Sequence, residues 1–579
     1  MPNASPSRPT EVSDLKAEQI PVGDHQLHGW KHFFGLYAGE HVAATEFVIG
    51  ATFVALGATT TNILIGLLVG NLLAIASWTL ITAPIAVQTR LSLYTYLHKI
   101  AGDSMTNLYN WANVLIFTVI SAAMITVSST AVRLLFGIPA QLQWYPTNSL
   151  FVLVVLCVGA IVVLVAMYGF SAVAEFSSIC GPWLVVMFTS GALVLMPALA
   201  ESVLGRTHLN SFADFITIGD QSIWTGINSE GQPGVGLFEV IGFAWAANTL
   251  THFGLIDMAL FRYAKSSMYG ICTSAGMLFG HYIAWIAAGI MGAGTAALLK
   301  TTIVELDPGD VAYRALGWSG YIIVIVAGWT TANANLYRAG LAAQAIFHNR
   351  SRGKVTLTVG CITVLIACFP FVFSQMLPLL TYAGLLVVPV GGIVFAEHFL
   401  FPRLGMTRYW ANYRKLEHSV PAIVSWIAGL VFGFGLNALN VMPFYYLFLP
   451  TWAFTILLYT VMARAYGATS AYPEEEAADQ ILNRQIADYH AHQANQQGEP
   501  VQDRTPLTRG LQVTAWISLA VILVLAMRVM FASATLRQYE SNVALFHTWG
   551  FVCTITYFAA AYAALRRKKS WGFEQGETS

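Results

Sequence analysis

Apolar stretches long enough to cross a membrane recur along the whole chain, and this feature most constrains the fold. A transmembrane helix needs about 20 mostly apolar residues, and the sequence offers about fourteen such windows. The composition agrees, since 56% of the residues are apolar and only 10% are charged, against about 25% charged in an ordinary soluble chain. We therefore predict an all-α polytopic membrane protein.

The predicted spans divide the chain into a long core and an appended pair of helices. In chain order they are 33–57, 62–87, 108–137, 149–169, 172–199, 235–259, 268–298, 319–347, 354–373, 376–400, 420–441, 444–466, 511–532 and 542–565. A tail at 1–32 precedes a core of ten helices at 33–400 and helices 11 and 12 at 401–466. A polar linker at 467–510, predicted to be partly helical, separates these from two additional helices at 511–566 and a tail at 567–579.

The charges give the expected orientation and exclude one class of partner. Lys and Arg (29) balance Asp and Glu (29), so no basic surplus points to nucleic acid. Most basic residues fall in alternate connections, and the positive-inside rule then predicts a cell-membrane protein with both termini cytoplasmic. The polar first 29 residues carry no apolar stretch behind a basic start, so no cleavable signal peptide is expected.

Enzymatic chemistry is not expected. The six cysteines lie inside apolar windows without metal-finger spacing, which is typical of small core residues. The sequence has no phosphate loop, nucleophile elbow or metal-ligand cluster.

Polar residues inside a span mark pathways or sites, because they are costly at membrane depth. The first span contains Gly39, Glu40, His41 and Glu46 within eight residues. Small residues such as Gly39 in a segment of this kind are typical of a helix that unwinds in the membrane and frees carbonyls for a cation. The alternative is that Glu40 and His41 lie at the cytoplasmic end of the span, solvated or paired.

The sixth span carries an aromatic residue beside polar ones. Trp245, Asn248, Thr249 and His252 share one helical face, a combination that suits a flat ring rich in heteroatoms. The alternative is a packing face with satisfied polar groups. Spans 1 and 6 are five apart and similarly interrupted, which favours an inverted repeat of five plus five helices.

Spans 3 and 8 supply further candidates. The hydroxyls of Thr330 and Thr331 are hard oxygen ligands for a sodium ion, although both could instead bond to their own helix. Phe117 and Ser121 belong to a stripe that either lines a cavity or packs closely through small residues.

These motifs resemble the nucleobase:cation symporter-1 family (purine/cytosine permease-like transporters), whose fold is LeuT-like. The resemblance covers roughly residues 30–466 and rests on five segments, of which the span 8 match is the most specific. They are Gly66-Leu67-Leu68-Val69-Gly70-Asn71-Leu72-Leu73-Ala74, Thr82-Ala83-Pro84-Ile85, Phe261-Arg262-Tyr263-Ala264, Trp329-Thr330-Thr331-Ala332-Asn333-Ala334-Asn335-Leu336-Tyr337 and Glu397-His398-Phe399.

The resemblance implies two sets of site residues. The sodium ligands would be the carbonyl of Ala327, the hydroxyls of Thr330 and Thr331, and carbonyls near Glu40 and Ala43. The substrate would stack on Trp245, with Phe117 at the family's span 3 aromatic position and Ser121 at its glutamine position. Gly39, Glu46, Asn248 and Asn333 complete the expected substrate-binding set.

The resemblance implies symport by alternating access, in which a cation drives uptake of a small planar nitrogenous compound such as cytosine or a purine. The hydroxyl pair favours Na+ as the coupling ion, with H+ as the alternative. The chain departs from the family at Asn333, where an acid is usual, and at Glu40 and Glu46, which are additional. Two rival functions follow: an amino-acid or amine carrier that uses Glu40 or Glu46 as counter-charge, and a membrane sensor on a transporter scaffold. The expected partners are a small-molecule substrate and the lipid bilayer, with the oligomeric state left open.

Overall fold

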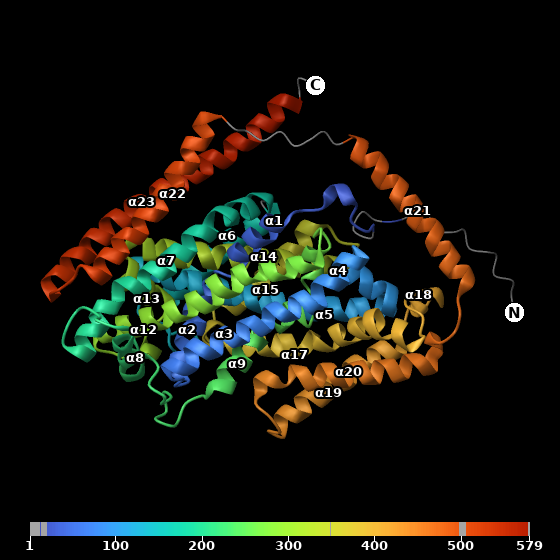
Figure 1. Cartoon of the computed structure of the whole chain (residues 1–579), viewed down its shortest axis with the longest axis horizontal. Coiled ribbons are helices and arrows are strands. Elements are labelled where there is room, and N and C mark those ends of the chain that lie inside the picture. The colour runs from blue at the N-terminus through green and yellow to red at the C-terminus, as the bar shows by residue number, and fades with distance from the viewer. Residues whose placement is uncertain are drawn as a thin grey trace.

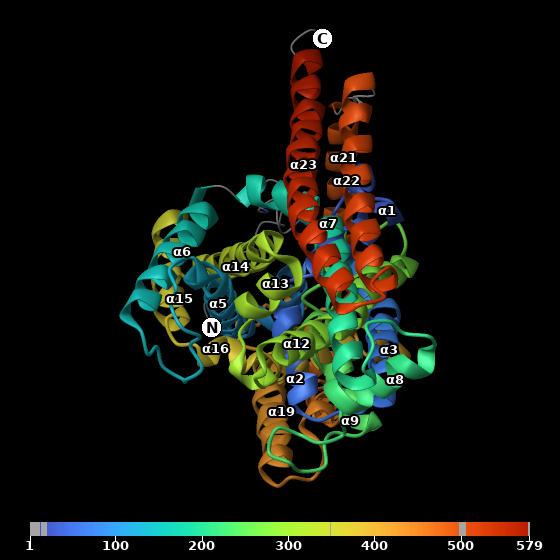
Figure 2. The same cartoon turned by 90° about the vertical axis from the view of Figure 1, so that its left-hand side faces the viewer.

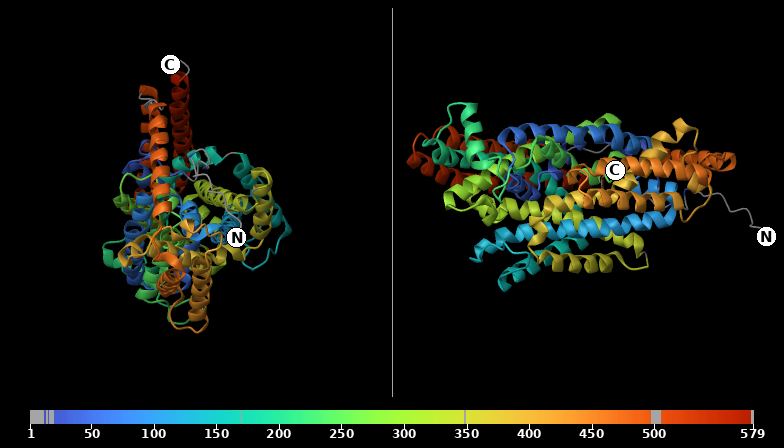
Figure 3. Two further views of the ribbon diagram at one scale, coloured as in Figure 1. Left: turned by 90° about the vertical axis from the view of Figure 1, so that its right-hand side faces the viewer. Right: turned by 90° about the horizontal axis from the view of Figure 1, so that it is seen from below.

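The chain folds into a bundle of helices that run along its long axis (Figure 1; Figure 3, right). The structure is a computed structural model that describes residues 20–168, 170–347, 349–496 and 505–576, and the isolated residues 12 and 15. Within these ranges the chain forms no strand, and its β-type pairing is limited to three isolated bridges. The predicted all-α class is confirmed.

Two of the helical rods are broken, as the sequence predicts. The first consists of α1 (Trp30–Glu40) and α2 (Thr45–Ala55), with four residues between them outside any helix. The other consists of α9 (Leu237–Ala246), α10 (Thr249–His252) and α11 (Met258–Phe261). The regular helical hydrogen-bonding pattern is therefore interrupted at both breaks, which is the local structure that ion and substrate sites in membrane bundles use.

Most of the remaining long helices fall on predicted spans, and several short helices lie between them. Before the second break come α3 (Thr60–Ser77), α4 (Ala83–Thr89), α5 (Leu93–Leu135), α6 (Ser149–Tyr168), α7 (Phe170–Leu204) and α8 (Phe212–Ile218). After it come α12 (Trp285–Leu299), α13 (Pro308–Leu316), α14 (Trp318–Ile346), α15 (Arg352–Ala367), α16 (Phe371–Ser374), α17 (Met376–Phe395), α18 (Trp410–Tyr413), α19 (Val420–Ala438), α20 (Phe448–Ala463), α21 (Pro473–Gln496), α22 (Pro506–Phe531) and α23 (Leu536–Gly576).

Ten helices of the described chain are long and apolar enough to cross a membrane. The four other predicted spans each have a physical reason for missing that criterion. Spans 1 and 6 are broken, span 9 is short at 16 residues (α15), and span 8 (α14) is diluted by Thr330, Thr331, Asn333 and Asn335.

Span 3 begins earlier than predicted. Its helix α5 starts at Leu93 and bends at Gly102, whose φ is 78°. A Cβ there would stand 2.3 Å from the carbonyl oxygen of Leu416, so the bend requires glycine. The segment before the bend is thus helical, where the sequence suggested a loop.

The last two helices form a hairpin on one side of the bundle (Figures 1 and 2). The indole of Trp183 in α7 donates to Thr554 of α23 at 3.1 Å, and the hydroxyl of Tyr557 donates to the carbonyl of Ile179 at 2.6 Å. Helix α21 lies near the end at which α1 begins, where His490 contacts the carbonyl of Pro21 at 2.8 Å. We call this the amino-terminal end of the bundle.

Candidate functional site

The break between α1 and α2 is held tightly by its neighbours. A Cβ on Gly280 would stand 1.8 Å from the carbonyl oxygen of His41, so only glycine lets the segment preceding α12 approach the break this closely. On another side, a Cβ on Gly181 of α7 would stand 2.9 Å from the Cα of Gly39. The predicted site residue Gly39 therefore lies at a close crossing of α1 and α7.

An ion pair joins the end of α1 to α14. The Nη2 of Arg338 donates to Oε1 of Glu40 at 2.7 Å, and the two side chains are 33% and 27% exposed. The ring of Phe117 in α5 is 1% exposed and lies against the guanidinium, 5.7 Å from its central carbon. Two predicted site residues, Glu40 and Phe117, thus meet through Arg338.

A fixed register between α5 and α14 explains this meeting. Ser121 donates to the carbonyl of Ala332 at 2.9 Å, and Ser128 donates to that of Ile325 at 3.3 Å. The residue numbers rise along α5 as they fall along α14, so the helices are antiparallel and Phe117 comes level with the turn of Arg338. Since the hydroxyl of Ser121 is used for this helix contact, the structure places it between helices.

Glu46 is fully enclosed in the first turn of α2, directly after the break. Its side chain is 1% exposed and accepts hydrogen bonds from the backbone N–H of Ala43 (3.3 Å), the hydroxyl of Thr45 (3.1 Å) and the indole N–H of Trp285. All three donors are neutral. A cation brought close to this carboxylate would therefore add a charge partner that these contacts do not supply.

The sixth span presents its two candidates in different directions. Trp245 donates from its indole to the hydroxyl of Ser77 at 3.0 Å and packs edge-on against Phe448 of α20. Asn248 instead contacts His281 at 3.0 Å, and His281 stacks on Trp285 with ring centroids 4.4 Å apart. Asn248 and Glu46 therefore share a neighbourhood around Trp285, whereas Trp245 faces α3 and α20.

The predicted sodium ligands of α14 bond to their own helix. Thr331 donates to the carbonyl of Ala327 at 2.8 Å, and Thr330 donates to that of Val326 at 2.9 Å and more weakly to Ala327 at 3.3 Å. The amide of Asn333 likewise donates to the carbonyl of Trp329 at 3.0 Å. Each hydroxyl oxygen still has lone pairs after donating, so the donor types suit a hard cation such as Na+.

A buried carboxylate holds three rods together towards the amino-terminal end of the bundle. Asp257, 2% exposed, accepts from the hydroxyl of Tyr37 in α1 and from the indole of Trp78 after α3, both at 2.7 Å. The hydroxyl of Thr82 also donates to the carbonyl of His252 at 2.6 Å. These contacts tie the rod of α1, the rod of α3 and the region of α10 and α11 into one unit at this end.

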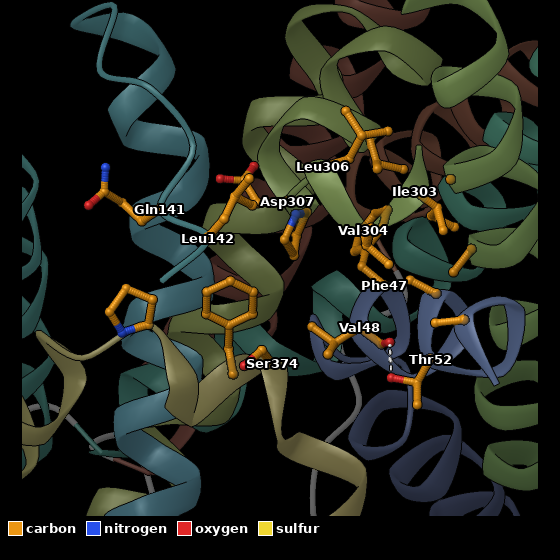
Figure 4. Close-up of a pocket in the computed structure, with 18 of the residues that line it drawn as sticks. Phe47, Val48, Thr52, Gln141, Leu142, Ile303, Val304, Leu306, Asp307 and Ser374 are labelled. Carbon is orange, nitrogen blue, oxygen red and sulfur yellow. Dashed lines mark hydrogen bonds between the residues drawn. The ribbon is translucent and has the colours of Figure 1, made fainter. Parts of the chain in front are cut away.

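A cavity of about 220 Å³ opens at the opposite end of the bundle, beyond the break (Figure 4). Phe47 and Val48, which directly follow Glu46, line its wall on the α2 side, and Ala288 of α12 lies beside them. Leu306 and Asp307 before α13 and Ser374 of α16 contribute to the other side. The cavity wall therefore includes Phe47, the residue that directly follows the enclosed Glu46 in the chain.

No protein-family model matches the sequence, and no curated protein matches it. Solved structures do match over most of the chain. The inward-facing conformation of Mhp1 aligns with a TM-score of 0.61 at 14% identity, over 80% of this chain and 97% of that chain. Mhp1 is a nucleobase-cation-symport-1 family transporter, and its closed conformation with bromovinylhydantoin bound aligns with a TM-score of 0.58 at 14% identity, over 82% and 99%.

A third structure gives the same result. The substrate-bound outward-open state of a Na+-coupled sialic acid symporter aligns with a TM-score of 0.52 at 16% identity, over 78% of this chain and 93% of that chain. The chain has the Mhp1 fold. The predicted LeuT-like architecture is confirmed, and the proteins that share it here are transporters rather than enzymes.

The prediction from sequence did not include three residues on which this site depends. Arg338 lies seven residues after Thr331, two helical turns on the same face, and this spacing was the available signal. His281 and Trp285 lie in span 7, where a histidine at membrane depth is itself a signal. Each acquires its role from a partner on another helix.

Proposed function

We propose that the chain is a secondary active transporter that couples entry of a cation, Na+ in the first instance, to symport of a small planar nitrogenous compound such as cytosine or a purine. The observation that carries this proposal is the pair of broken rods in a transporter fold, with polar side chains at each break. Unwound helices at the centre of a bundle are the usual ion and substrate sites of such transporters.

The proposed cycle is alternating access. The cation binds between the α1/α2 break and α14, with Ala327, Thr330 and Thr331 as ligands on one side and carbonyls near Glu40 and Ala43 on the other. Substrate binds beside the breaks, and the unit formed by the rods of α1, α3 and α9 with α12 then rocks against α5 and α14. The Asp257 contacts support this movement of one unit, because they join three of its members.

Uptake into proteoliposomes tests the proposal. Labelled cytosine, adenine, guanine, uracil and allantoin are offered with an inward Na+ gradient, an inward H+ gradient or neither. Accumulation of a ring under the Na+ gradient, lost in Thr331→Ala, is expected. Thr358→Ala is the matched control, since the Thr358 hydroxyl also donates to its own helix, to the carbonyl of Lys354 at 3.0 Å. Binding without accumulation under any gradient would favour a sensor instead.

A second candidate is an amine carrier, and Glu46 favours it. Its carboxylate is enclosed with three neutral donors, so an ammonium group of a substrate would complete the charge balance. The same vesicles distinguish the two functions if amines and amino acids are added to the panel. Accumulation of amines alone, abolished in Glu46→Gln, would replace the planar-ring proposal.

A further inference from the structure

We propose that Glu40 and Arg338 together form the recognition site for an uncharged ring that carries an N–H donor next to a C=O acceptor, as in a cyclic amide or ureide. This inference rests on the proposed function and names the edge chemistry of its substrate. The carboxylate accepts from the ring N–H, and the guanidinium donates to the ring carbonyl. Neither residue belongs to the span 8 motif or to the polar stripe of the sixth span.

The pair has unused hydrogen-bonding capacity. A guanidinium has five N–H donors and a carboxylate has about four lone-pair sites. In the described chain the pair is joined by one hydrogen bond, from Nη2 of Arg338 to Oε1 of Glu40. The side chains of Arg338 and Glu40 are 33% and 27% exposed, so the protein does not fully enclose either one. A ligand can reach atoms that the protein itself does not saturate.

The surroundings fix the orientation of this pair. Glu40 ends α1 directly before the break, so its position changes when the two halves of that rod change their angle. Arg338 stands on α14, which is locked in register with α5 by Ser121 and Ser128. Phe117 lies against the guanidinium and is itself buried, so it acts as a positioning residue. Recognition therefore joins the broken rod to the helix pair of α5 and α14.

The sign of the charges disfavours a ligand that carries a single charge. A carboxylate ligand would pair with Arg338 but would face the like charge of Glu40, and an ammonium would pair with Glu40 but face Arg338. A neutral edge with adjacent donor and acceptor bonds to both and leaves the pair's net charge at zero. Hydrogen bonds to charged groups are about twice as strong as neutral ones, so a ligand with this edge also binds more tightly.

Equilibrium binding to the purified full-length protein tests the inference without transport. Uracil is compared with 1,3-dimethyluracil, which keeps the carbonyls but lacks the N–H groups, and with benzoate and benzylamine as charged flat rings. We expect uracil to bind more tightly than each of the others by about tenfold or more, the value of one charge-assisted hydrogen bond. This comparison uses the unaltered chain and does not depend on a variant folding.

Variants then assign the effect to the pair. Glu40→Gln and Arg338→Gln are each expected to weaken uracil binding about tenfold or more, and Glu40→Gln is expected to leave the affinity for 1,3-dimethyluracil unchanged, because that ring has no N–H to donate to Glu40. Phe117→Leu is expected to reduce the ratio of the affinity for uracil to the affinity for 1,3-dimethyluracil. Arg206→Gln is the control, because Arg206 has the same 33% exposure and also pairs with a carboxylate, Asp214, at 2.8 Å.

The outcomes separate the two proposals. Equal affinity for the two uracils, tighter binding of benzoate or benzylamine, or unchanged uracil affinity in both Gln variants would overturn the recognition site while vesicle uptake of a ring still stood. If the unaltered chain neither binds nor accumulates any ring under any gradient, the proposed function fails, and this inference fails with it.

Discussion

The described part of the chain contains two interior Arg–carboxylate pairs that differ in how completely they are satisfied. At the far end of α5, Arg133 uses Nε for Asp307 (2.6 Å), Nη1 for the carbonyl of Ile138 (2.7 Å) and Nη2 for Asp310. Arg133 and Asp307 are 3% and 2% exposed. Beside the α1/α2 break, nearer the middle of α5, Arg338 has a single bond to Glu40, and that pair is about ten times more exposed.

This difference separates a structural role from a functional one. A buried pair whose arms are all bonded has nothing to offer a ligand, and breaking it leaves a charge stranded in a low-dielectric interior. A partly exposed pair with one bond contributes less to stability, because fewer hydrogen bonds are lost when it is broken. The Arg133 cluster therefore fastens α5 to α13, whereas the Arg338 pair is available for recognition.

The largest expected effect follows from breaking the buried pair. Asp307→Asn or Arg133→Gln should lower the free energy of unfolding by about 3–5 kcal/mol, the usual loss when one partner of a buried pair is removed. Unfolding of the purified protein in detergent micelles, followed by denaturant titration, measures this change. Asp103→Asn is the control, because Asp103 is 66% exposed where it pairs with His98, and its removal should leave the transition unchanged. If Asp307→Asn and Arg133→Gln changed the free energy of unfolding as little as Asp103→Asn, the structural role assigned to Arg133 would be wrong.

A double-mutant cycle on the partly exposed pair of Glu40 and Arg338 should give a much smaller energy. Glu40→Gln, Arg338→Gln and the double variant should show a coupling energy of about 0.2–1 kcal/mol in the same unfolding measurement, typical of solvent-screened pairs. The cycle on Arg133 and Asp307 provides the comparison on the same protein. Coupling energies of equal size for the two pairs would remove the distinction between them, and Glu40 would then be a structural tie between α1 and α14.

The sequence predicted the fold well because the membrane imposes a strong pattern. Apolar windows of about 20 residues identify spans directly, and the glycines and carboxylates around Glu40 correctly indicated a broken helix. Only local information was required for either conclusion. The bend at Gly102 was missed because its cause, the approach of the Leu416 carbonyl, lies more than 300 residues away in the chain.

The candidate site was harder to predict, because side-chain direction depends on neighbouring helices. Trp245 and Asn248 were assigned to one helical face. The helix is interrupted at 247–248, however, and their side chains meet different partners, Ser77 and His281. Glu40 was expected beside the cation and is bonded to Arg338. A periodic pattern identifies which residues share a face of an intact helix, and it loses that meaning where the helix is interrupted.

The smallest expected effect concerns a third pair, Arg206 and Asp214, in the loop that carries α8. Asp214 accepts from the backbone N–H of Asn210 (2.6 Å) and Ser211 (3.2 Å) and from Arg206 (2.8 Å), and these contacts, the Asn210 bond first, hold the pKa of its carboxyl below the usual range. A group whose folded pKa is depressed stabilises the fold above its unfolded pKa of about 3.9, and this contribution is lost as the pH falls through the folded value. Hydrogen exchange of residues 208–218, corrected for the intrinsic rate, should therefore lose protection as the pH falls below about 4 in the natural chain but not in Asp214→Asn. The same pH dependence in both chains would mean that the loop is held by its backbone alone, and that this pair, unlike the other two, makes no measurable contribution.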